Sequence, residues 1–337
     1  MTSNPGAAVL AIDGGNSKTD VALVALDGTV LAAARGPGSC HQNIGLNRTR
    51  SLLTELVAKA AATAGLDPAG PVATHASVCL AGADLPVEVD LLIETLADTG
   101  WAPSMRIDND TFALLRAGTD AANAAAVVCG AGINCVGVAA NGATARFPAL
   151  GRLTGDWGGG VGLGEEALWF ATRAEDGRGE PTALQDAVAA HFGLPSPLAV
   201  SEAMHLEKIG AGRVSELTPV LMAVARAGDP VALRVVERLA EEVCLLAVVA
   251  LRRLDLLDAD ADVVLGGGVL TGSGPVVLDR IADRLRVAAP RAQIRLVHEP
   301  PVVGAALLGL DLLGAGAEAE HRVRGALTAA VQAVRAA

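Results

Sequence analysis

The order of short apolar runs along this chain constrains its fold more than any other feature, because the same order occurs twice. Residues 8–12, 19–26 and 29–34 form three such runs, and Asp27-Gly28 between the last two is a dipeptide typical of a β-hairpin. Helical and strand-like patterns then alternate as far as residue 118. A second set of three strand-like runs begins at residue 125 and is again followed by helices and strands. The order predicts an α/β protein made of two copies of one βββαβαβα unit that face each other across a cleft.

The remaining elements follow from periodicity and from the glycines that end them. In the first unit we expect helices at 43–64, 87–98 and 110–117, and strands at 73–80 and 104–107. In the second we expect strands at 125–129, 134–139, 144–147, 262–265 and 293–297, a long helical stretch at 165–253, and helices at 276–287 and 303–313. The boundary is predicted near residues 119–124, which gives domains at 1–118 and 119–302. The Ala-rich segment 316–337 is predicted to be a peripheral helix or tail.

Charge and composition exclude several classes of function. The 337 residues include 37 acidic and 26 basic side chains, a net charge of −11, which argues against nucleic acid and anionic membranes as partners. Aromatic residues make up 2% of the chain, so base-stacking surfaces are missing. Five cysteines, an odd number without a Cys-x-x-Cys pair, predict neither disulfides nor a zinc knuckle. Because a signal-peptide pattern and an apolar run of about 20 residues are both missing, we expect a cytoplasmic protein.

The first motif that can carry chemistry joins the first two strands and reads Asp13-Gly14-Gly15-Asn16-Ser17-Lys18-Thr19. Its glycines let the backbone approach a ligand closely, and its amides can donate hydrogen bonds to phosphate oxygens. Ser17 and Thr19 add hydroxyl donors. Asp13, at the end of a strand, is placed to hold Mg²⁺, a cation that keeps several waters and takes few carboxylates. The spacing of a Walker A loop is absent, and an ordinary hairpin turn capped by Asp13 is the alternative.

A second acidic motif, Asp108-Asn109-Asp110-Thr111, follows the strand expected at 104–107 and begins a helix. Asp110 thus falls at the carboxyl end of a strand, where α/β sheets bind ligands. A carboxylate in that place can act as the general base that accepts the proton of a hydroxyl during phosphoryl transfer. The alternative is that Asp108 and Asp110 only cap the helix.

Two short glycine motifs lie in the second half of the chain. Gly130-Ala131-Gly132 joins two strands and suits a second phosphate-binding turn, although a hairpin with a left-handed turn would have the same sequence. Gly266-Gly267-Gly268 follows a strand, and the absence of side chains there suits a flat ring lying against the backbone. An ordinary glycine-rich connection between strand and helix is the alternative for this second motif.

A tryptophan lies within a run of glycines, Gly155-Asp156-Trp157-Gly158-Gly159-Gly160, which continues to Gly162, Gly164 and Glu165. The segment is too rich in glycine for a helix and too long for a simple turn, so we expect a loop. In a chain with so few aromatic residues, the Trp157 ring is expected to face a ligand, and tryptophan faces pack well on sugar rings. The alternative is a ring that fills the core of the loop.

Taken in order, these motifs resemble those of the sugar kinase, Hsp70 and actin superfamily. In particular, residues 8–313 resemble the BadF/BadG/BcrA/BcrD-type ATPase family and its N-acetylglucosamine kinase-like branch. The segments that carry the resemblance are AIDGGNSKTD (11–20), PGSCHQNIG (37–45), LAGAD (80–84), DND (108–110), CGAGINC (129–135), GDWGGGVGLGEEAL (155–168), LGGGVL (265–270) and PPVVGAALLG (300–309). The resemblance implies two RNase H-like (actin-like ATPase) domains flanking a cleft, with the final helix at 303–313 packed back on the first domain.

The resemblance also implies a role for each motif. Asp13, Gly14, Gly15, Asn16, Ser17, Lys18 and Thr19 would bind the phosphates of ATP, with Asp13 also near Mg²⁺. Asp110 would be the catalytic base. Gly130, Ala131 and Gly132 would contact phosphate, and Gly266, Gly267 and Gly268 the adenosine. The sugar would be bound by Cys40, His41, Gly82, Asp110, Asn134, Cys135, Asp156, Trp157 and Glu165.

The sequence departs from the family pattern in three of its motifs. Cys40 stands where the family has a sugar-contacting Asn, Ala131 and Ile133 replace hydroxyl residues, and Gly164-Glu165-Glu166-Ala167 replaces a Gly-Asp-Glu-Gly run. These departures bear on the identity of the sugar more than on the activity, because backbone amides can still hold phosphate. The dehydratase-activating branch of the family holds an iron–sulfur cluster through cysteines, and no suitable cysteine pair is visible here.

We therefore expect an ATP-dependent kinase that phosphorylates an amino sugar, such as N-acetylglucosamine or glucosamine, at its 6-hydroxyl, with Asp110 as the general base. The expected cofactors are ATP and Mg²⁺, and the expected partners are a small-molecule sugar and a second copy of the chain in a homodimer. Two alternatives stay open. One is an ATPase that activates a partner protein. The other is a non-catalytic sugar sensor, which the missing loop hydroxyls favour and the intact Asp13 and Asp110 oppose.

Overall fold

The computed structural model describes residues 6–336 and divides into two compact units. Unit 1 runs over Met1–Asp120 and Val297–Ala337, and unit 2 over Ala121–Leu296. The chain therefore leaves unit 1 once and returns to it for its last forty residues or so. The sequence placed the boundaries at residues 118 and 302, so the return to unit 1 comes a few residues earlier than the helix expected at 303–313.

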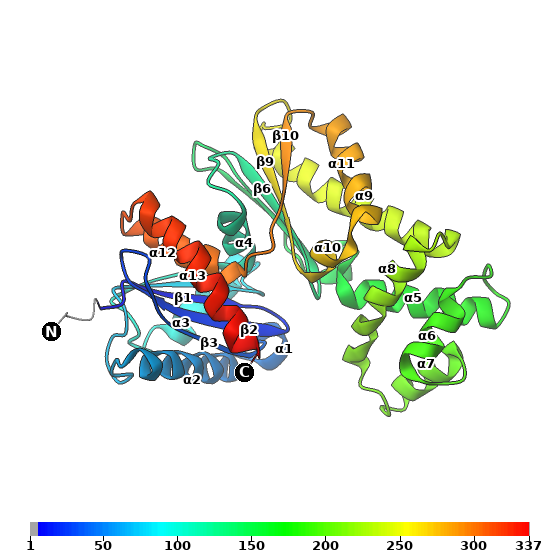
Figure 1. The fold of residues 1–337 in the computed structure, drawn as a ribbon, viewed down its shortest axis with the longest axis horizontal. Helices are drawn as coiled ribbons and strands as arrows, with labels where there is room; N and C mark the ends of the chain where they lie inside the picture. The colour runs from blue at the N-terminus through cyan, green and yellow to red at the C-terminus, as the bar shows by residue number, and fades with distance from the viewer. Residues whose placement is uncertain (1–5, 337) are drawn as a thin grey trace. The chain divides into compact units, whose positions relative to one another are not determined.

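Unit 1 is built on a five-stranded mixed sheet with the strand order β3-β2-β1-β4-β5 (Figure 1). The strands are β1 (Val9–Gly14), β2 (Lys18–Val24), β3 (Val30–Pro37), β4 (His75–Leu80) and β5 (Ser104–Asn109). The first three pair antiparallel, and β1, β4 and β5 run parallel. The register places Asp13, Cys79 and Asp108 side by side across the parallel strands. The carboxyl ends of β1, β4 and β5 therefore meet at one edge of the sheet.

Helices cover both faces of this sheet, as Figure 1 shows. The helices are α1 (His41–Ile44), α2 (Leu46–Ala64), α3 (Pro86–Leu96), α4 (Asp110–Gly118), α12 (Pro301–Leu312) and α13 (Ala317–Ala336). Leu53 of α2 packs with Leu10 and other strand residues on one face. Leu307 of α12 and Leu327 of α13 pack with Val9 and its neighbours on the other face. The alternation of buried side chains along β1 thus serves two separate cores.

Unit 2 repeats the same sheet topology, with the strand order β10-β9-β6-β7-β8. Its strands are β6 (Ala124–Cys129), β7 (Ile133–Val138), β8 (Thr144–Arg146), β9 (Ala261–Gly266) and β10 (Ala292–Leu296). Again the first three pair antiparallel, and β6, β9 and β10 run parallel. The two sheets therefore share one plan, and the predicted α/β fold of two RNase H-like domains is confirmed.

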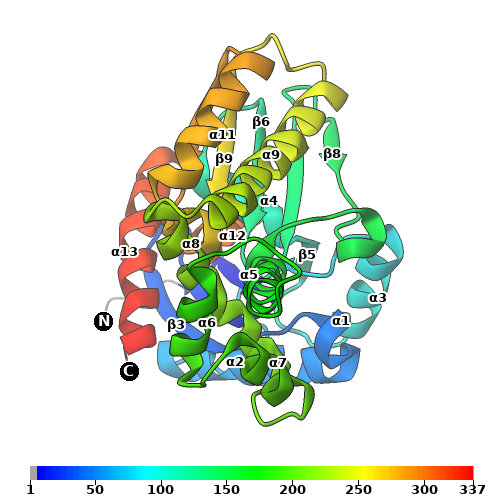
Figure 2. The same ribbon diagram turned by 90° about the vertical axis from the view of Figure 1, so that its right-hand side faces the viewer.

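The helices of unit 2 form two groups (Figure 2). The elements are η1 (Gly151–Thr154), α5 (Gly159–Glu175), α6 (Leu184–Phe192), α7 (Pro197–His205), η2 (Ala211–Glu216), α8 (Leu217–Arg226), α9 (Pro230–Arg253), α10 (Gly268–Ser273) and α11 (Pro275–Ala288). The long helices α9 and α11 lie side by side along the sheet, and α5 to α8 pack on one another. One continuous core joins both groups to the strands.

One expectation about the glycine-rich segment is wrong in detail. The segment from Gly155 onward is a loop only as far as Gly158, because α5 begins at Gly159 in spite of its glycines. Gly159 and Gly164 lie where neighbouring backbone comes too close for a side chain: an added Cβ would lie 2.5 Å from Ala131 O and 2.0 Å from Val214 O, respectively. The helical stretch expected at 165–253 consists of several helices separated by turns.

Smaller differences have local causes. The first long helix begins at Leu46 and not at residue 43, because Gly45 adopts a positive φ of 79° and separates α1 from α2. The segment expected as a helix or tail at 316–337 forms the helix α13 over Ala317–Ala336, with Val323 and Leu327 fully buried. Residue 337 and residues 1–5 lie outside the described part of the chain. No helix within residues 6–336 is both long enough and apolar enough to span a membrane.

Candidate active site

Asp13 is buried at the carboxyl end of β1, with 5% of its surface exposed. Removal from water raises the pKa of this carboxyl to about 7, against the opposing attraction of the Lys18 ammonium. The turn that follows is partly fixed by backbone bonds: Gly15 N donates to Lys18 O at 2.9 Å, and Gly15 O accepts from Ser39 N at 3.1 Å. Because C=O and N–H of a trans peptide point in opposite directions, the Asn16 amide is directed away from Ser39. Asn16 and Ser17 themselves are exposed.

Thr19, at the end of the same turn, uses its hydroxyl within the protein. Its Oγ1 donates to Pro37 O at 2.8 Å and lies 2.9 Å from Ser39 Oγ, and the residue is fully buried. Gly14 is required by the same packing, since an added Cβ would lie 2.4 Å from Ser39 Oγ. The structure thus places Thr19 in the wall behind the turn, while Ser17 is on its outer side.

Asp20 is a buried charge that the sequence reading missed. It is 1% exposed, and it faces Asp13 across the β1–β2 pair. Arg35 donates to both its carboxylate oxygens, at 2.6 and 2.8 Å, and Lys18 Nζ donates at 2.9 Å. These donors hold the pKa of Asp20 below its usual range in spite of burial. Alternating charges on paired strands, Lys18, Asp20 and Arg35, are the signal that could have revealed this cluster.

Asp110 occupies the first turn of α4, directly after β5. The N-cap of α4 is Asn109, whose Oδ1 accepts from Thr111 N at 3.0 Å, so the interpretation of the aspartates as caps is wrong. Burial, together with the nearby charges of Asp13 and Asp84, raises the pKa of Asp110 to about 8. The parallel strands therefore bring Asp13 close enough to Asp110 for its negative charge to disfavour ionisation of Asp110.

Asp84 is the third member of this acidic group and was also missed as a functional candidate. It follows β4, which lies between β1 and β5, and its Oδ1 accepts from Asn109 Nδ2 at 2.8 Å. An acidic residue shortly after each of three adjacent parallel strands is the pattern that would have indicated it. We call Asp13, Asp84 and Asp110 the acidic cluster of unit 1.

Cys40 and His41 both lie close to Gly82, and Cys40 is near Asp84 and Asp110 of the acidic cluster. Cys40 is 2% exposed, and burial raises the pKa of its thiol. Gly82 has a φ of 85°, and an added Cβ would lie 3.0 Å from Cys40 Sγ and 3.1 Å from His41 Cε1. His41 Nε2 lies 3.8 Å from Glu88 Oε1, whereas its Nδ1 is buried without a hydrogen-bond partner among the described residues. A buried ring nitrogen in that state is a place for a ligand hydroxyl.

In unit 2, the turn Gly130-Ala131-Gly132 joins β6 to β7 and is anchored to α5. Gly130 O accepts from Gly160 N at 2.7 Å, and Ala131 O accepts from Val161 N at 3.2 Å. The amides of Ala131 and Gly132 therefore point away from α5. Neither glycine has a positive φ, and an added Cβ at either would meet no atom within 4 Å. The left-handed turn considered from the sequence is thus wrong, and the fold itself does not require these glycines.

The second glycine motif spans the end of β9 and the start of α10. Gly267 has a φ of 89°, and an added Cβ would lie 2.4 Å from Cys129 O, so the chain cannot easily carry a side chain there. Gly268 begins α10, is exposed, and would tolerate a Cβ without contact. Gly266 ends β9 beside Val128. Of Gly267 and Gly268, only Gly267 is therefore required by close packing and by its φ.

Trp157 is buried, with 8% of its surface exposed, and belongs to the core of unit 2. The Arg238 guanidinium of α9 lies over its ring, 4.3 Å from the centroid, and its Nε1 donates to Glu166 Oε1 at 3.4 Å. One ring face is thus already covered, as in the alternative in which Trp157 fills the core. The neighbouring Asp156 accepts from Thr154 Oγ1 at 2.7 Å, and Glu165 is exposed on α5.

The last two predicted sugar contacts are neighbours on β7 but point differently. Cys135 is 1% exposed, and its Sγ lies 3.6 Å from Leu246 O in the core. Asn134 is half-buried, and its Oδ1 accepts from the backbone amide of Cys135 at 2.7 Å. A contact from Asn134 can therefore come from its side chain, whereas the Cys135 thiol faces α9. Among residues 6–336, no group of three or more His, Cys, Asp or Glu side chains is arranged to hold a metal ion.

Comparison with known proteins gives relatives of similar length. An N-acetylmuramic acid/N-acetylglucosamine kinase from Clostridium acetobutylicum is 25% identical over 304 residues, which cover 89% of this chain and 97% of the relative. An N-acetyl-D-glucosamine kinase from Dictyostelium discoideum is 25% identical over 312 residues, which cover 90% of this chain and 97% of the relative.

Solved structures with the same fold include a candidate N-acetylglucosamine kinase from Chromobacterium violaceum. Its TM-score is 0.71 at 23% identity, with 90% of this chain and 99% of that chain covered. A ROK family glucokinase from Streptomyces griseus, solved with glucose and AMPPNP, has a TM-score of 0.54 at 18% identity, with 89% and 98% covered. A family model described as the BadF/BadG/BcrA/BcrD ATPase family matches residues 10–309. The chain therefore belongs to the BadF/BadG/BcrA/BcrD ATPase family.

Proposed function

We propose that this protein is an ATP-dependent kinase that transfers the γ-phosphoryl group of ATP to a hydroxyl of an amino sugar. The observation that supports this most is Asp110, a carboxylate at the carboxyl end of β5 whose pKa is raised to about 8. A general base works best when its pKa lies near the working pH, and burial together with the charges of Asp13 and Asp84 brings the pKa of Asp110 into that range. The acceptor is proposed to be N-acetylglucosamine or glucosamine, in line with the activities named for the two relatives.

In the proposed step, Asp110 accepts the proton of the sugar hydroxyl, for which we propose the 6-hydroxyl. The hydroxyl oxygen forms a bond to the γ-phosphorus while the bond from that phosphorus to the bridging oxygen of ADP breaks. The products are a sugar phosphate, ADP and a proton carried by Asp110, which is later released to water. Asp13 and Asp84 help by keeping the Asp110 carboxylate basic through their negative charge.

The turns of both units suit the phosphates of ATP. In unit 1 the Asn16 amide points outward from a turn anchored at Gly15, and in unit 2 the Ala131 and Gly132 amides point away from α5. Lys18, whose side chain is 42% exposed, adds a positive charge beside the first turn. For the adenosine we propose backbone contacts at Gly266–Gly268, where the last glycine is exposed.

The donors of unit 1 fit a magnesium ion that is held by a single protein carboxylate, that of Asp13. The Asp13 carboxyl is buried and desolvated beside a turn suited to phosphate, and among the described residues no cluster could hold a metal by itself. Mg²⁺ commonly takes one or two carboxylates and completes its shell with phosphate oxygens and water. When bound, it would neutralise the negative charge that builds up on the ADP phosphates as ADP leaves. Asp13 is the residue proposed to hold it, directly or through water.

Cys40, His41 and Gly82 supply the proposed sugar contacts of unit 1. The buried Nδ1 of His41 lacks a partner among the described residues and can bond a sugar hydroxyl. We propose that Cys40 and Gly82, which lie close to each other, set how large a substituent the sugar can carry there. In unit 2 we propose contacts from Asn134, Asp156 and Glu165. For Trp157 and Cys135, which are largely buried, the predicted sugar contacts stay predictions, as does the homodimer.

A panel assay tests this function. ADP release from Mg-ATP is measured with N-acetylglucosamine, glucosamine, N-acetylmuramic acid, N-acetylmannosamine and glucose, each compared with no sugar. Strong stimulation by one amino sugar is the expected result. Steady ADP release that no sugar changes would replace the proposal by an ATPase that acts on a partner protein. Sugar binding without any ADP release would replace it by a sensor.

A further inference from the structure

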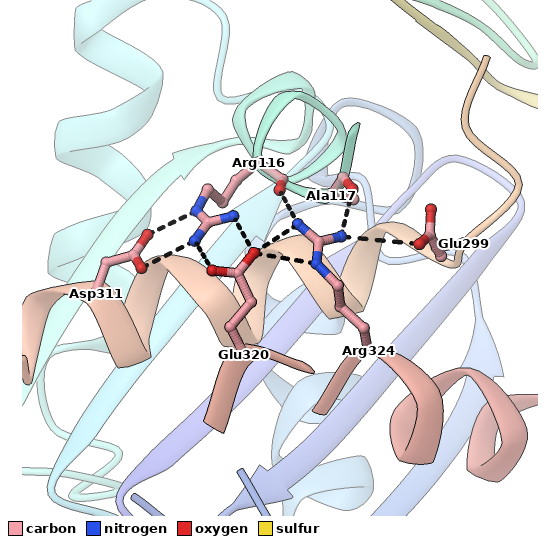
Figure 3. A network of polar contacts seen from close by, with 6 residues as sticks. All are labelled: Arg116, Ala117, Glu299, Asp311, Glu320 and Arg324. Carbon is pink, nitrogen blue, oxygen red and sulfur yellow. Dashed lines mark hydrogen bonds and ion pairs between the residues drawn. The ribbon is translucent and has the colours of Figure 1, made fainter. Parts of the chain in front are cut away.

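Helix α4, which carries Asp110 in its first turn, is held at its other end by a network of charged side chains from two later helices (Figure 3). The network joins Arg116 of α4, Asp311 of α12, and Glu320 and Arg324 of α13, and Glu299 lies beside it. None of these residues belongs to the motifs that point to catalysis. All of them belong to unit 1.

Arg116 is the centre of the network and is 14% exposed. Its Nε and Nη2 donate to Asp311 at 2.8 and 3.1 Å, and its Nη1 and Nη2 donate to Glu320, both at 2.9 Å. The guanidinium is therefore gripped by two carboxylates, each through two oxygens, the geometry in which arginine fixes orientation best. The bonds from Arg116 hold the pKa of Glu320 down at about 2, so this carboxylate stays charged near neutral pH.

Arg324 connects the same carboxylate to the backbone of α4. It donates to Glu320 Oε1 at 2.9 Å from Nη2 and at 3.1 Å from Nε. Its Nη1 donates to Ala117 O at 2.6 Å, and its Nη2 to Arg116 O at 3.3 Å. The last carbonyls of a helix have no partner within the helix, so Arg324 caps the carboxyl end of α4 from outside.

The contact between α4 and α12 is close enough to transmit this anchoring. An added Cβ at Gly304 of α12 would lie 1.7 Å from Ala113 O, so the two helices meet backbone to backbone. A helix of nine residues is only about 13 Å long. If its carboxyl end shifts or frays, the turn that carries Asp110 moves with it, and displacements near 1 Å at a catalytic group can cost about a hundredfold in rate.

We propose that Arg116, Glu320 and Arg324 are positioning residues that hold α4, and with it Asp110, in the geometry needed for proton transfer. The C-terminal helix α13 would then contribute to catalysis without approaching the substrates. This inference rests on the proposed function, because it assigns Asp110 the role of base.

The test compares two variants of α13 that each remove one ion pair. Glu320→Gln removes the carboxylate shared by Arg116 and Arg324. Arg322→Gln, two residues along the helix, removes the ion pair with Asp27 in the turn between β2 and β3 and does not touch α4. We expect Glu320→Gln to lower kcat about tenfold with a much smaller change in the KM for sugar, and Arg322→Gln to leave both near the wild-type values. Glu320→Asp, which keeps the charge, should recover part of the loss.

A pH profile and hydrogen exchange separate positioning from simple destabilisation. In Glu320→Gln the apparent pKa in the profile of kcat/KM against pH should shift, because Asp110 moves relative to its acidic neighbours. In Glu320→Gln the amides of residues 114–118 should exchange faster than in wild type. In Arg322→Gln the same amides should exchange at the wild-type rate. Equal losses of kcat in both variants, or an unchanged kcat in Glu320→Gln, would overturn the inference.

The exchange measurement also separates this inference from the proposed function. If the wild-type protein transfers phosphate to no sugar, the proposed function fails, and the amides of α4 still show whether the network anchors the helix. Unchanged exchange in Glu320→Gln would then overturn the inference without reference to any activity.

Discussion

The two units share one sheet plan but differ in what they place at the carboxyl ends of their parallel strands. In unit 1 Asp13 lies near the end of β1, and Asp84 and Asp110 follow β4 and β5. In unit 2 the corresponding ends of β6 and β9 are followed by Gly130 and Gly267. Unit 1 thus presents side chains that ionise, and unit 2 presents backbone amides. The comparison teaches that one sheet topology can carry different chemical groups at the same strand ends, and in the proposed function the base comes from unit 1 alone.

The hairpin turns of the two units nevertheless follow one principle. In each, a turn carbonyl is bonded to a neighbouring segment: Gly15 O accepts from Ser39 N, and Gly130 O accepts from Gly160 N. The next amide along the chain is therefore directed outward in both. The two turns differ in length, because Gly14 pairs with Thr19 in unit 1 whereas Cys129 pairs with Ile133 in unit 2. They also differ in the charged residues around them.

Removal of the proposed base is expected to have the largest effect on kcat. A small effect would contradict the comparison, in which unit 1 provides the ionising groups. Asp110→Asn should lower kcat about a thousandfold, or about 4 kcal/mol in the activation barrier, because general base catalysis is lost. Asp108→Asn is the matched control, since Asp108 ends the same strand and is paired with Arg106 at 2.6 Å. Steady-state kinetics of both variants with the best sugar from the panel measure this. A similar kcat for both variants would contradict the assigned role.

The backbone role of unit 2 predicts a large effect on stability at one glycine and none at its neighbour. Gly267→Ala should lower the free energy of unfolding by about 2–3 kcal/mol, because its φ of 89° and the 2.4 Å approach of Cys129 O leave no room for a methyl group. Gly268→Ala should leave the stability near that of wild type. Urea unfolding of the two variants is the measurement, and equal stabilities would show that Gly267 is not under this constraint.

The buried carboxylates of unit 1 predict a dependence of stability on pH. Asp13 has a pKa of about 7 in the folded protein and an ordinary value of 3.8. Between about pH 4 and 7 the folded state binds more protons than the unfolded state, so this residue makes the free energy of unfolding fall as pH rises. Asp13→Asn should therefore be about 4 kcal/mol more stable than wild type at pH 8 and nearly equal to it at pH 4. Urea unfolding across this range would contradict the account if the difference stayed constant.

The smallest expected effect tests how the turn of unit 2 is held. Thr218 of α8 donates to Gly160 O at 2.7 Å in the first turn of α5, which in turn anchors Gly130. Thr218→Val should lower the free energy of unfolding by about 1 kcal/mol and raise the KM for ATP severalfold. Thr172→Val is the control, because its hydroxyl lies 3.3 Å from Ser201 Oγ, far along α5 from that turn. An unchanged KM in Thr218→Val would show that the anchoring does not reach the nucleotide.

Much of the fold could be predicted because its signals are local. Alternating apolar runs and the Asp27-Gly28 turn indicate the strands of unit 1, and the repeated order indicates a second copy. The start of α5 was missed because glycine usually ends a helix. Here Gly159 and Gly164 are needed where the helix meets the backbone of Ala131 and Val214, a contact that no local pattern reveals.

The candidate site was predictable where a motif stands at a strand end and not where partners come from elsewhere. Asp13 and Asp110 were found in this way. Asp20 was overlooked because its meaning depends on Arg35 in another strand, at 2.6 Å. The bonds from Arg116 to Asp311 and Glu320 join residues about two hundred positions apart, so only the folded chain shows them.

The most direct test of the central claim identifies the product. The protein is incubated with Mg-ATP and N-acetylglucosamine, and the phosphorus-31 and carbon-13 NMR spectra of the mixture are recorded. The account predicts a phosphomonoester on the sugar, coupled to its sixth carbon, formed in equal amount with ADP. Inorganic phosphate as the phosphorus product, formed at the same rate with and without sugar, would contradict it.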